Sequence, residues 1–212
     1  RGLRKVRGTV RPEAREAEIR GLRAIVSQYR PVAFIKGGVF EPLGSPWTHL
    51  DAAAPRERIQ STFASVGRVE LLEMPWTYGG TAFVVGPDLV MTNRHVAQQF
   101  CEGVGTGEGR LSFRPGEAGL DFKREVDSPD DEGGILHVRG VVMIHPYWDM
   151  ALLRVDGLAP DHPALTLATR EPESFFGKDV VVIGYPARDD VRNDPATQDR
   201  IFESTYNVKR LQ

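Results

Sequence analysis

Apolar residues recur at helical spacing in two segments of the first 66 residues, 12–29 and 55–66. The first segment has Pro12 in its first turn, and the second is followed by Gly67, a typical helix stop. The apolar positions that share one face are Ile19, Leu22, Ile25, Val26 and Tyr29 in the first segment and Ile59, Phe63 and Val66 in the second. A short strand is predicted at 32–35. This part of the chain therefore predicts a mainly helical extension.

From residue 67 onward the apolar runs become short and are separated by turn residues, which is typical of β-strands. The predicted strands cover residues 69–73, 80–85, 89–92, 111–113, 121–126, 135–144, 151–155, 179–185 and 200–208. Residues 158–173 are rich in proline and acids and predict a connection between two groups of strands. We therefore expect an all-β protein in three parts: an N-terminal helical extension (1–66), a first β-barrel (67–157), and a linker with the start of a second β-barrel (158–212).

Two strand boundaries carry residues that suit acid–base chemistry. His95 follows the strand at 89–92, and Asp149 comes shortly before the strand at 151–155. The unperturbed pKa of histidine lies near neutrality, so an imidazole can accept and return a proton. A carboxylate bonded to its other ring nitrogen fixes the tautomer and stabilises the imidazolium. His95 precedes Asp149 by 54 residues, which fits a Ser-His-Asp triad arranged along the chain as His, Asp, Ser.

The motifs around these two residues resemble those of a known family. A Gly-led apolar hairpin leads into Thr92-Asn93-Arg94-His95-Val96, which resembles the His box of trypsin-like serine peptidases. Asp149-Met150-Ala151-Leu152-Leu153 resembles the family's Asp box. The resemblance covers about residues 70–212. It implies a chymotrypsin-like double β-barrel in which His95 is the catalytic base and Asp149 its orienting carboxylate.

The third member of such a triad does not occur in the sequence, because no Gly-Asp/Asn-Ser-Gly segment follows Asp149. The family's second barrel needs about six strands, whereas only two are predicted after residue 158, and two alone would leave unpaired edges. We therefore expect a second barrel that is incomplete here, a chain truncated or nicked at Gln212, and a nucleophilic serine outside this chain. The chain alone is then expected to be inactive.

A closer resemblance is to bacterial cytosolic trypsin-like proteins, through Arg30-Pro31-Val32-Ala33-Phe34 and Ile183-Gly184-Tyr185-Pro186-Ala187. Some proteins of this group carry a DNA/RNA non-specific endonuclease domain. The resemblance implies two partners: a protein or peptide substrate, and the C-terminal remainder of the same protein with the second barrel and, where fused, a nuclease domain. Nucleic acid would be a partner only through such a nuclease, of which this sequence has no motif.

Composition bears on the compartment. The chain is 41% hydrophobic and 26% charged with a formal net charge of −2, so no basic excess indicates nucleic-acid binding. The apolar stretches are too short to span a membrane, and no membrane partner is expected. The single cysteine, Cys101, excludes an internal disulfide and favours a reducing, cytoplasmic location.

Several residues near the predicted dyad have a structural interpretation beside a functional one. We expect Cys101 to be a small core residue and not a nucleophile. His145 is expected to be a loop histidine bonded to backbone, although it could tune the triad. Arg94 is interpreted as a rim charge that could contact substrate. Trp148 could shield Asp149 from water or simply pack.

Metal and cofactor sites are not expected. Three further histidines are scattered without metal-ligand spacing: His49, His137 and His162. The four acids of the loop at 127–134, Asp127, Asp130, Asp131 and Glu132, lack the pattern of a calcium loop and are interpreted as solvated.

The sequence thus predicts a bacterial serine endopeptidase of trypsin-like fold, which hydrolyses peptide bonds and is regulated in the cytosol. No Arg/Lys-Ile-Val-Gly-Gly activation segment precedes Gly80, so we expect loop ordering or a partner to assemble the site, as in HtrA-like proteins. The helices within residues 12–66 are expected to hold or sense an inactive state. Two alternatives stay open: a catalytically dead trypsin-fold module that binds peptides, and a regulatory peptidase domain of a fused nuclease.

Overall fold

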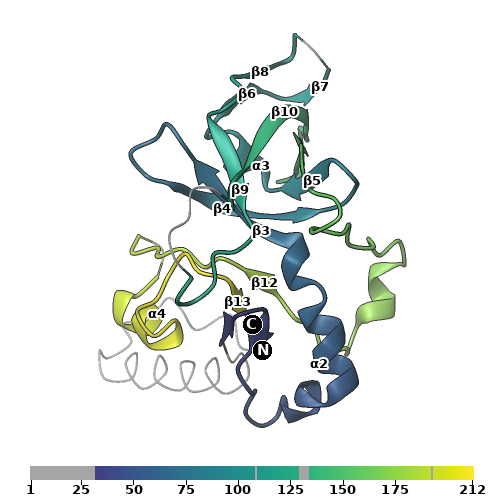
Figure 1. Cartoon of the computed structure of the whole chain (residues 1–212), viewed down its shortest axis with the longest axis vertical. Helices are drawn as coiled ribbons and strands as arrows, with labels where there is room; N and C mark the ends of the chain where they lie inside the picture. Colours follow the sequence, from purple (N-terminus) through teal and green to yellow (C-terminus); the bar gives the residue numbers. More distant parts are fainter. Residues whose placement is uncertain (1–31, 108, 129–133, 192) are drawn as a thin grey trace, which may run out of the picture.

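The structure is a computed structural model that describes residues 32–107, 109–128, 134–191 and 193–212 (Figure 1). The helix predicted at 12–29 and the acids Asp130, Asp131 and Glu132 lie outside the described residues. Within the described part, no helix is long and apolar enough to cross a membrane.

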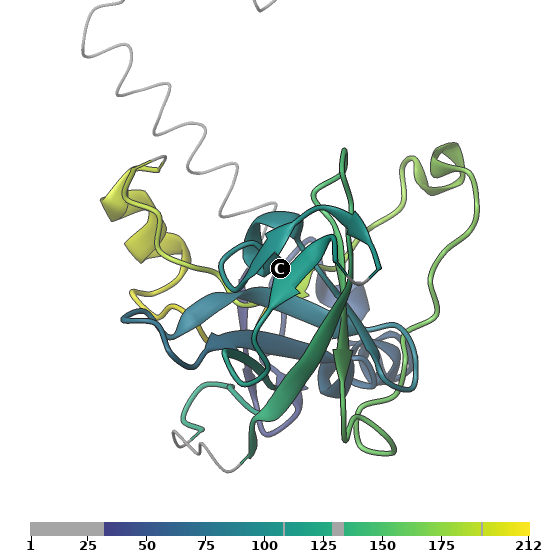
Figure 2. The same cartoon turned by 90° about the horizontal axis from the view of Figure 1, so that it is seen from above.

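The largest sheet of the described residues closes into an antiparallel barrel, which lies in the upper half of Figure 1 and is seen from above in Figure 2. Its six strands are β3 (Val66–Leu71), β4 (Tyr78–Val84), β5 (Leu89–Thr92), β9 (Ala118–Asp121), β10 (Leu136–Ile144) and β11 (Ala151–Val155). Their order is β11-β5-β4-β3-β9-β10, and β10 pairs back with β11 to close the ring. The short strand β7 (Gly105–Thr106) pairs antiparallel with the end of β10, opposite Met143 and Ile144. Closure removes the free edges that an open sheet of this size would expose.

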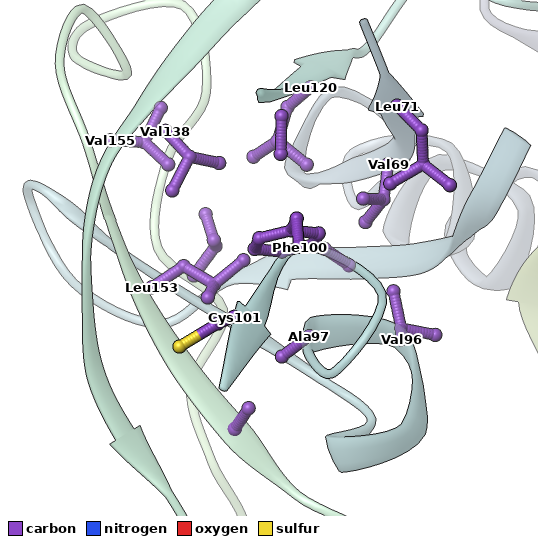
Figure 3. Packing of buried hydrophobic residues seen from close by; sticks show 14 of the residues in the cluster. Val69, Leu71, Val96, Ala97, Phe100, Cys101, Leu120, Val138, Leu153 and Val155 are labelled. Atoms are coloured by element: carbon purple, nitrogen blue, oxygen red, sulfur yellow. The ribbon is translucent and has the colours of Figure 1, made fainter. Parts of the chain in front are cut away.

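The barrel is filled by the apolar side chains that alternate along its strands (Figure 3). In β11, for example, Ala151, Leu153 and Val155 are buried while Arg154 between them is exposed. Residues that share this core come from every barrel strand and from the segment after β5: Val69, Leu71, Val84, Val90, Val96, Phe100, Cys101, Leu120, Val138 and Ile144. The core therefore reaches from the strands into the segment that carries His95.

A second, smaller sheet joins the two ends of the described chain. It consists of β12 (Ile183–Gly184), β13 (Arg210–Leu211), β1 (Ala33–Lys36) and β2 (Val39–Phe40), in that order. Gly37 and Gly38 turn the chain between β1 and β2 at positive φ, which glycine adopts without strain. Apolar side chains of this sheet, including Phe40, form a second hydrophobic cluster with Leu43 and Phe63, separate from the barrel core.

The remaining elements are short. They are the 3-10 turns η1 (Thr48–Asp51), η2 (Phe63–Ser65) and η4 (Pro172–Phe175), the helices α2 (Ala53–Gln60), α3 (Arg94–Ala97) and α4 (Pro195–Ile201), and the strand pair β6 (Cys101–Gly103) with β8 (Leu111–Phe113). The helix predicted at 55–66 is thus α2 followed by a 3-10 turn, because the chain enters β3 at Val66.

Buried polar side chains tie the C-terminal segment to the barrel. The guanidinium of Arg68 forms a buried ion pair with Glu70 and donates to the carbonyl oxygen of Asn207 at 2.9 Å. The ammonium of Lys209 is 1% exposed and donates to the carbonyl oxygens of Phe63 at 2.9 Å and Phe122 at 2.6 Å. Since buried charges must be paired or hydrogen-bonded, these contacts fix where the segment after residue 205 runs.

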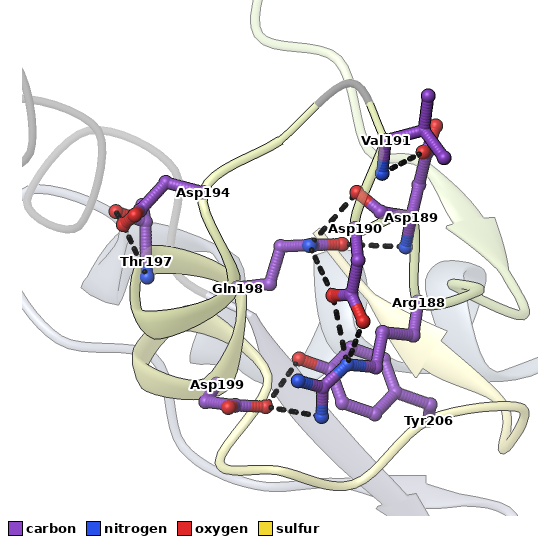
Figure 4. Close-up of polar contacts among 9 residues, drawn as sticks. All are labelled: Arg188, Asp189, Asp190, Val191, Asp194, Thr197, Gln198, Asp199 and Tyr206. Atoms are coloured by element: carbon purple, nitrogen blue, oxygen red, sulfur yellow. Dashed lines mark hydrogen bonds and ion pairs between the residues drawn. The ribbon is translucent and has the colours of Figure 1, made fainter.

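The strand predicted at 200–208 is wrong. Residues 200–208 contain the end of α4 (Figure 4) and a turn, and the next strand, β13, begins only at Arg210. Asp194 caps α4 by accepting from the backbone N–H of Thr197, and Pro195 occupies the first helical position. The amide of Gln198 then clamps the backbone of Asp189, accepting from its N–H at 2.8 Å and donating to its carbonyl at 3.0 Å.

Two other predicted strands are shorter than expected. The strand at 179–185 reduces to Ile183–Gly184, and the strand at 121–126 is replaced by Ala118–Asp121, after which Asp121 accepts from the N–H of Lys123 and turns the chain. The prediction of a mostly β protein with a chymotrypsin-like barrel is confirmed. The division into three domains stays a prediction.

Candidate active site

His95 lies on α3, which begins directly after β5. Asn93 precedes the helix in an extended conformation (φ −72°, ψ 148°), so the chain leaves the strand and turns into α3 within one residue. The helix packs very closely on β4. A Cβ atom at Gly80 would lie 2.4 Å from Cγ2 of Val96, so this approach requires glycine at position 80.

Asp149 lies in the loop between β10 and β11. Because β11 pairs with β5, with Ala151 opposite Thr92, the end of one strand and the start of the other lie side by side. The carboxylate of Asp149 meets His95 twice: Oδ2 lies 2.7 Å from Nδ1 of the ring, and Oδ1 accepts from the backbone N–H at 2.9 Å. Nδ2 of Asn93 lies 3.2 Å from both Oδ2 and the carbonyl oxygen of Asp149.

The electrostatics of the pair keep the carboxylate ionised. The backbone N–H of His95 is the main reason that the pKa of Asp149 lies below its usual range, and the His95 ring and Arg94 lower the pKa further. The pair lies at the surface, with the side chain of His95 68% exposed and that of Asp149 46% exposed. Among the described residues, Nε2 of His95 has no hydrogen-bond partner, so it is open to a group that approaches from solvent.

The structure thus brings together the two residues that the sequence singled out, in the geometry of a base and its orienting carboxylate. It does not bring a nucleophile to them, since no serine hydroxyl of the described residues is bonded to His95. Their catalytic role stays a prediction.

The loop that carries Asp149 is held by Arg94 and His145. The guanidinium of Arg94 donates to the carbonyl oxygens of His145 at 3.3 Å and Pro146 at 2.9 Å. Nδ1 of His145 accepts from the backbone N–H groups of Tyr147 and Trp148. The interpretation of His145 as a backbone-bonded loop histidine is confirmed, whereas the anchoring contact of Arg94 was missed.

Trp148 packs on His145 with the rings nearly parallel and their centroids 4.7 Å apart. Its side chain is nevertheless largely exposed, and Asp149 beside it stays half-exposed. Of the two interpretations of Trp148, the structure shows the packing.

Cys101 is the small core residue that the sequence predicted. It is 3% exposed inside the barrel cluster, and burial raises the pKa of its thiol. A thiol with a raised pKa is a poor nucleophile, because the thiolate is the reactive form.

In the described residues, no group of three side chains could hold a metal ion. His49 bonds Asp179, His162 stacks on Phe122 with centroids 3.9 Å apart, and Asp127 pairs with Lys36. An apolar pocket of about 500 Å³ lies between α2 and β12, lined by Leu50, Ile59, Phe83, Val181 and Ile183 among others. This pocket contains neither His95 nor Asp149, so it is separate from the pair.

Comparisons with solved structures find weak similarity to a protease. Among solved structures it is similar to the inactive form of the Rv3671c protease, with 22% identity, a TM-score of 0.32, and 65% of this chain and 61% of that chain covered. It is also similar to a mutant of Rv3671c from M. tuberculosis in its inactive form, with 20% identity, a TM-score of 0.37, and 73% and 69% covered.

The chain therefore spans less than two thirds of the first of these structures. No curated protein matches it. These structural similarities are too weak to assign a family, and the assignment rests on the domain match. The model of the trypsin-like peptidase domain matches residues 80–209, which include most of β4 as well as His95 and Asp149. The chain belongs to the trypsin-like peptidase domain family.

Proposed function

We propose that the protein is a serine endopeptidase in which His95 is the general base and Asp149 its orienting carboxylate. The observation that carries the proposal is the double contact of Asp149 with His95, at 2.7 Å to Nδ1 and 2.9 Å to the backbone N–H. This contact assigns the ring proton to Nδ1 when the imidazole is neutral. The lone pair is then on Nε2, which faces away from the carboxylate.

The chemistry follows from this tautomer. A serine hydroxyl that reaches Nε2 gives up its proton to His95 as its oxygen attacks the carbonyl carbon of a peptide bond. The imidazolium that forms is stabilised by Asp149, whose lowered pKa keeps it ionised over the neutral range. His95 then returns the proton to the leaving amine as the peptide bond breaks.

The nucleophile and the substrate belong to the proposal as well. The side chain of His95 is 68% exposed, so a serine from outside the described residues has room to approach it. We propose a protein or peptide as substrate, because the reaction that such a triad serves is acyl transfer.

The test uses the full-length protein, because the proposed serine lies outside the described residues, and a fluorophosphonate probe, which forms a covalent adduct with an activated serine. The 212 residues alone are expected to give no adduct. Wild-type protein is expected to be labelled, and Asp149→Asn should be labelled about 10⁴-fold more slowly, because an asparagine favours the wrong imidazole tautomer. The matched control is Asp156→Asn, since Asp156 is another exposed, ion-paired aspartate that pairs with Arg139. Labelling followed by intact mass gives the rate and the labelled chain.

Equal labelling of Asp149→Asn and wild type would contradict the roles proposed for the pair. Absence of any adduct in the full-length wild type would contradict the peptidase proposal itself. Binding of peptides without hydrolysis would then be the function to measure.

A further inference from the structure

Two kinds of hydrogen bond hold the loop between β10 and β11: backbone bonds that close its base, and bonds to the side chain of His145. The backbone N–H of His145 donates to the carbonyl oxygen of Met150 at 2.9 Å, and that of Met150 donates to the carbonyl oxygen of Trp148 at 2.8 Å. Asp149 lies inside this closed loop, so the conformation of the loop sets where its carboxylate points.

The imidazole of His145 provides the inner contact of the loop. Its Nδ1 lies 3.2 Å from the backbone N of Tyr147 and 2.9 Å from that of Trp148. Both partners are N–H donors, so Nδ1 must be the acceptor and the ring must carry its proton on Nε2. The ring of Trp148 covers one of its faces.

We propose that His145 is a positioning residue for the His95–Asp149 pair: its unprotonated Nδ1 holds the turn that presents Asp149, and protonation of His145 releases that turn. The inference rests on the proposed function, since it concerns the placement of the proposed base. Protonation converts Nδ1 from an acceptor into a third donor facing two N–H groups, so both contacts must break. An imidazole commonly makes this change near neutral pH.

The charged and titratable groups near this loop come from α3, from the residue before β8 and from the loop itself. Arg94 on α3 donates to the carbonyl oxygens of His145 and Pro146, which places a positive charge on this loop. Arg110 lies beside Gly105 of β7, the strand residue that pairs with Ile144. On the loop itself the titratable groups are Tyr147, in edge contact with the His145 ring, and Asp149, which is engaged with His95.

The test is an NMR titration of the protein between about pH 5 and pH 8, which needs no peptidase activity. In the wild type, the ring C–H signal of His95 is expected to shift in two steps, one of them coincident with the titration of His145. The variant His145→Asn keeps a side-chain acceptor for the N–H groups two and three residues on, but does not titrate. Its His95 signal should therefore shift in a single step.

A second variant removes the acceptor. In His145→Leu, the amide protons of Tyr147 and Trp148 should exchange about tenfold faster at neutral pH, and His145→Asn should restore their protection. The matched control is His137→Asn, because His137 lies on β10 with an exposed side chain. It should keep the two steps.

A single-step titration of His95 in the wild type would overturn the proposal, and so would unchanged amide exchange in His145→Leu. The comparison of wild type with His145→Asn stands even if the leucine variant does not fold. If the full-length wild type is not labelled by the fluorophosphonate but its His95 signal shifts in two steps, the proposed peptidase function is overturned and this inference is supported.

Discussion

Gly80 is the residue on which the position of His95 depends most directly. Its Cα faces Val96 of α3 so closely that a Cβ atom would lie 2.4 Å from a methyl carbon. Gly80→Ala is therefore expected to push α3 away from β4 and to lower the free energy of unfolding by about 1–3 kcal/mol, the usual cost of overpacking a core. Urea denaturation measures the loss.

The control for this variant is Gly140→Ala on β10. A Cβ atom at Gly140 would meet no atom within 4 Å, so its stability should change little. Equal destabilisation by the two variants would show that loss of glycine in a strand is the cause, and not contact with α3.

Local motifs were enough to find the two members of the pair. His95 and Asp149 each lie at a strand boundary in a short, distinctive segment, and pairing of β11 with β5 brings the two segments together. The residues that hold the loop of Asp149 could not be found in this way. Arg94 reaches carbonyl oxygens 51 and 52 residues further along the chain, and such a contact depends on the loop conformation.

At the scale of elements, α4 depends on its first residues. Oδ2 of Asp194 accepts from the backbone N–H of Thr197 at 2.9 Å and from its hydroxyl at 2.5 Å. Asp194→Ala removes this cap and is expected to lower the free energy of unfolding by about 1 kcal/mol. Asp194→Asn keeps an acceptor at the same position and should lose less. Thermal or urea unfolding of both variants checks the order, and an equal loss would contradict a capping role.

The elements of the barrel were easier to predict than those after it. The strands at 89–92, 111–113 and 151–155 have the predicted bounds, because turn residues flank short apolar runs. The apolar positions in residues 200–208 indicate a strand, but Asp194 and Pro195 start a helix that ends at Ile201. The signal was present in the sequence as a capping residue followed by proline, and it was outweighed by the β-branched and aromatic residues that follow.

Long-range pairing explains the remaining difference. β1 pairs with β13 through Ala33 and Leu211, which are far apart in the sequence. Hydrophobic periodicity specifies that a segment is a strand, but it does not specify a partner at this distance. The sheet that contains β1 and β13 was therefore not predicted, although the short strand near residue 33 was.

At the scale of the whole molecule, Lys209 links stability to pH. Burial lowers the pKa of its ammonium from 10.5 to about 8, and Glu125 at 3.9 Å offsets only part of this. Between these two values the unfolded chain binds a proton that the folded protein does not, so stability rises with pH across this window. Relative to Lys209→Met, the wild type should gain about 3 kcal/mol between pH 8 and pH 10.5.

Urea unfolding of both proteins at several pH values gives the difference. Lys36→Met serves as the control, because the ammonium of Lys36 is exposed and its pKa is raised by Asp127. Relative to Lys36→Met, the wild type should show no such gain in the free energy of unfolding between pH 8 and pH 10.5. A wild-type curve parallel to that of Lys209→Met would mean that folding does not lower the pKa of Lys209, and therefore that its ammonium is more hydrated than its burial indicates.

The burial of Cys101 makes the protein a convenient background for site-specific labelling. It is the single cysteine of the chain, and it lies 3% exposed among the apolar side chains of the barrel with a thiol whose pKa is raised. A maleimide dye should therefore leave the folded wild-type protein unmodified. A cysteine introduced at the exposed position of Tyr147 would then carry the only reporter, and its fluorescence would follow the motion of the loop next to His95 without interference from a second dye.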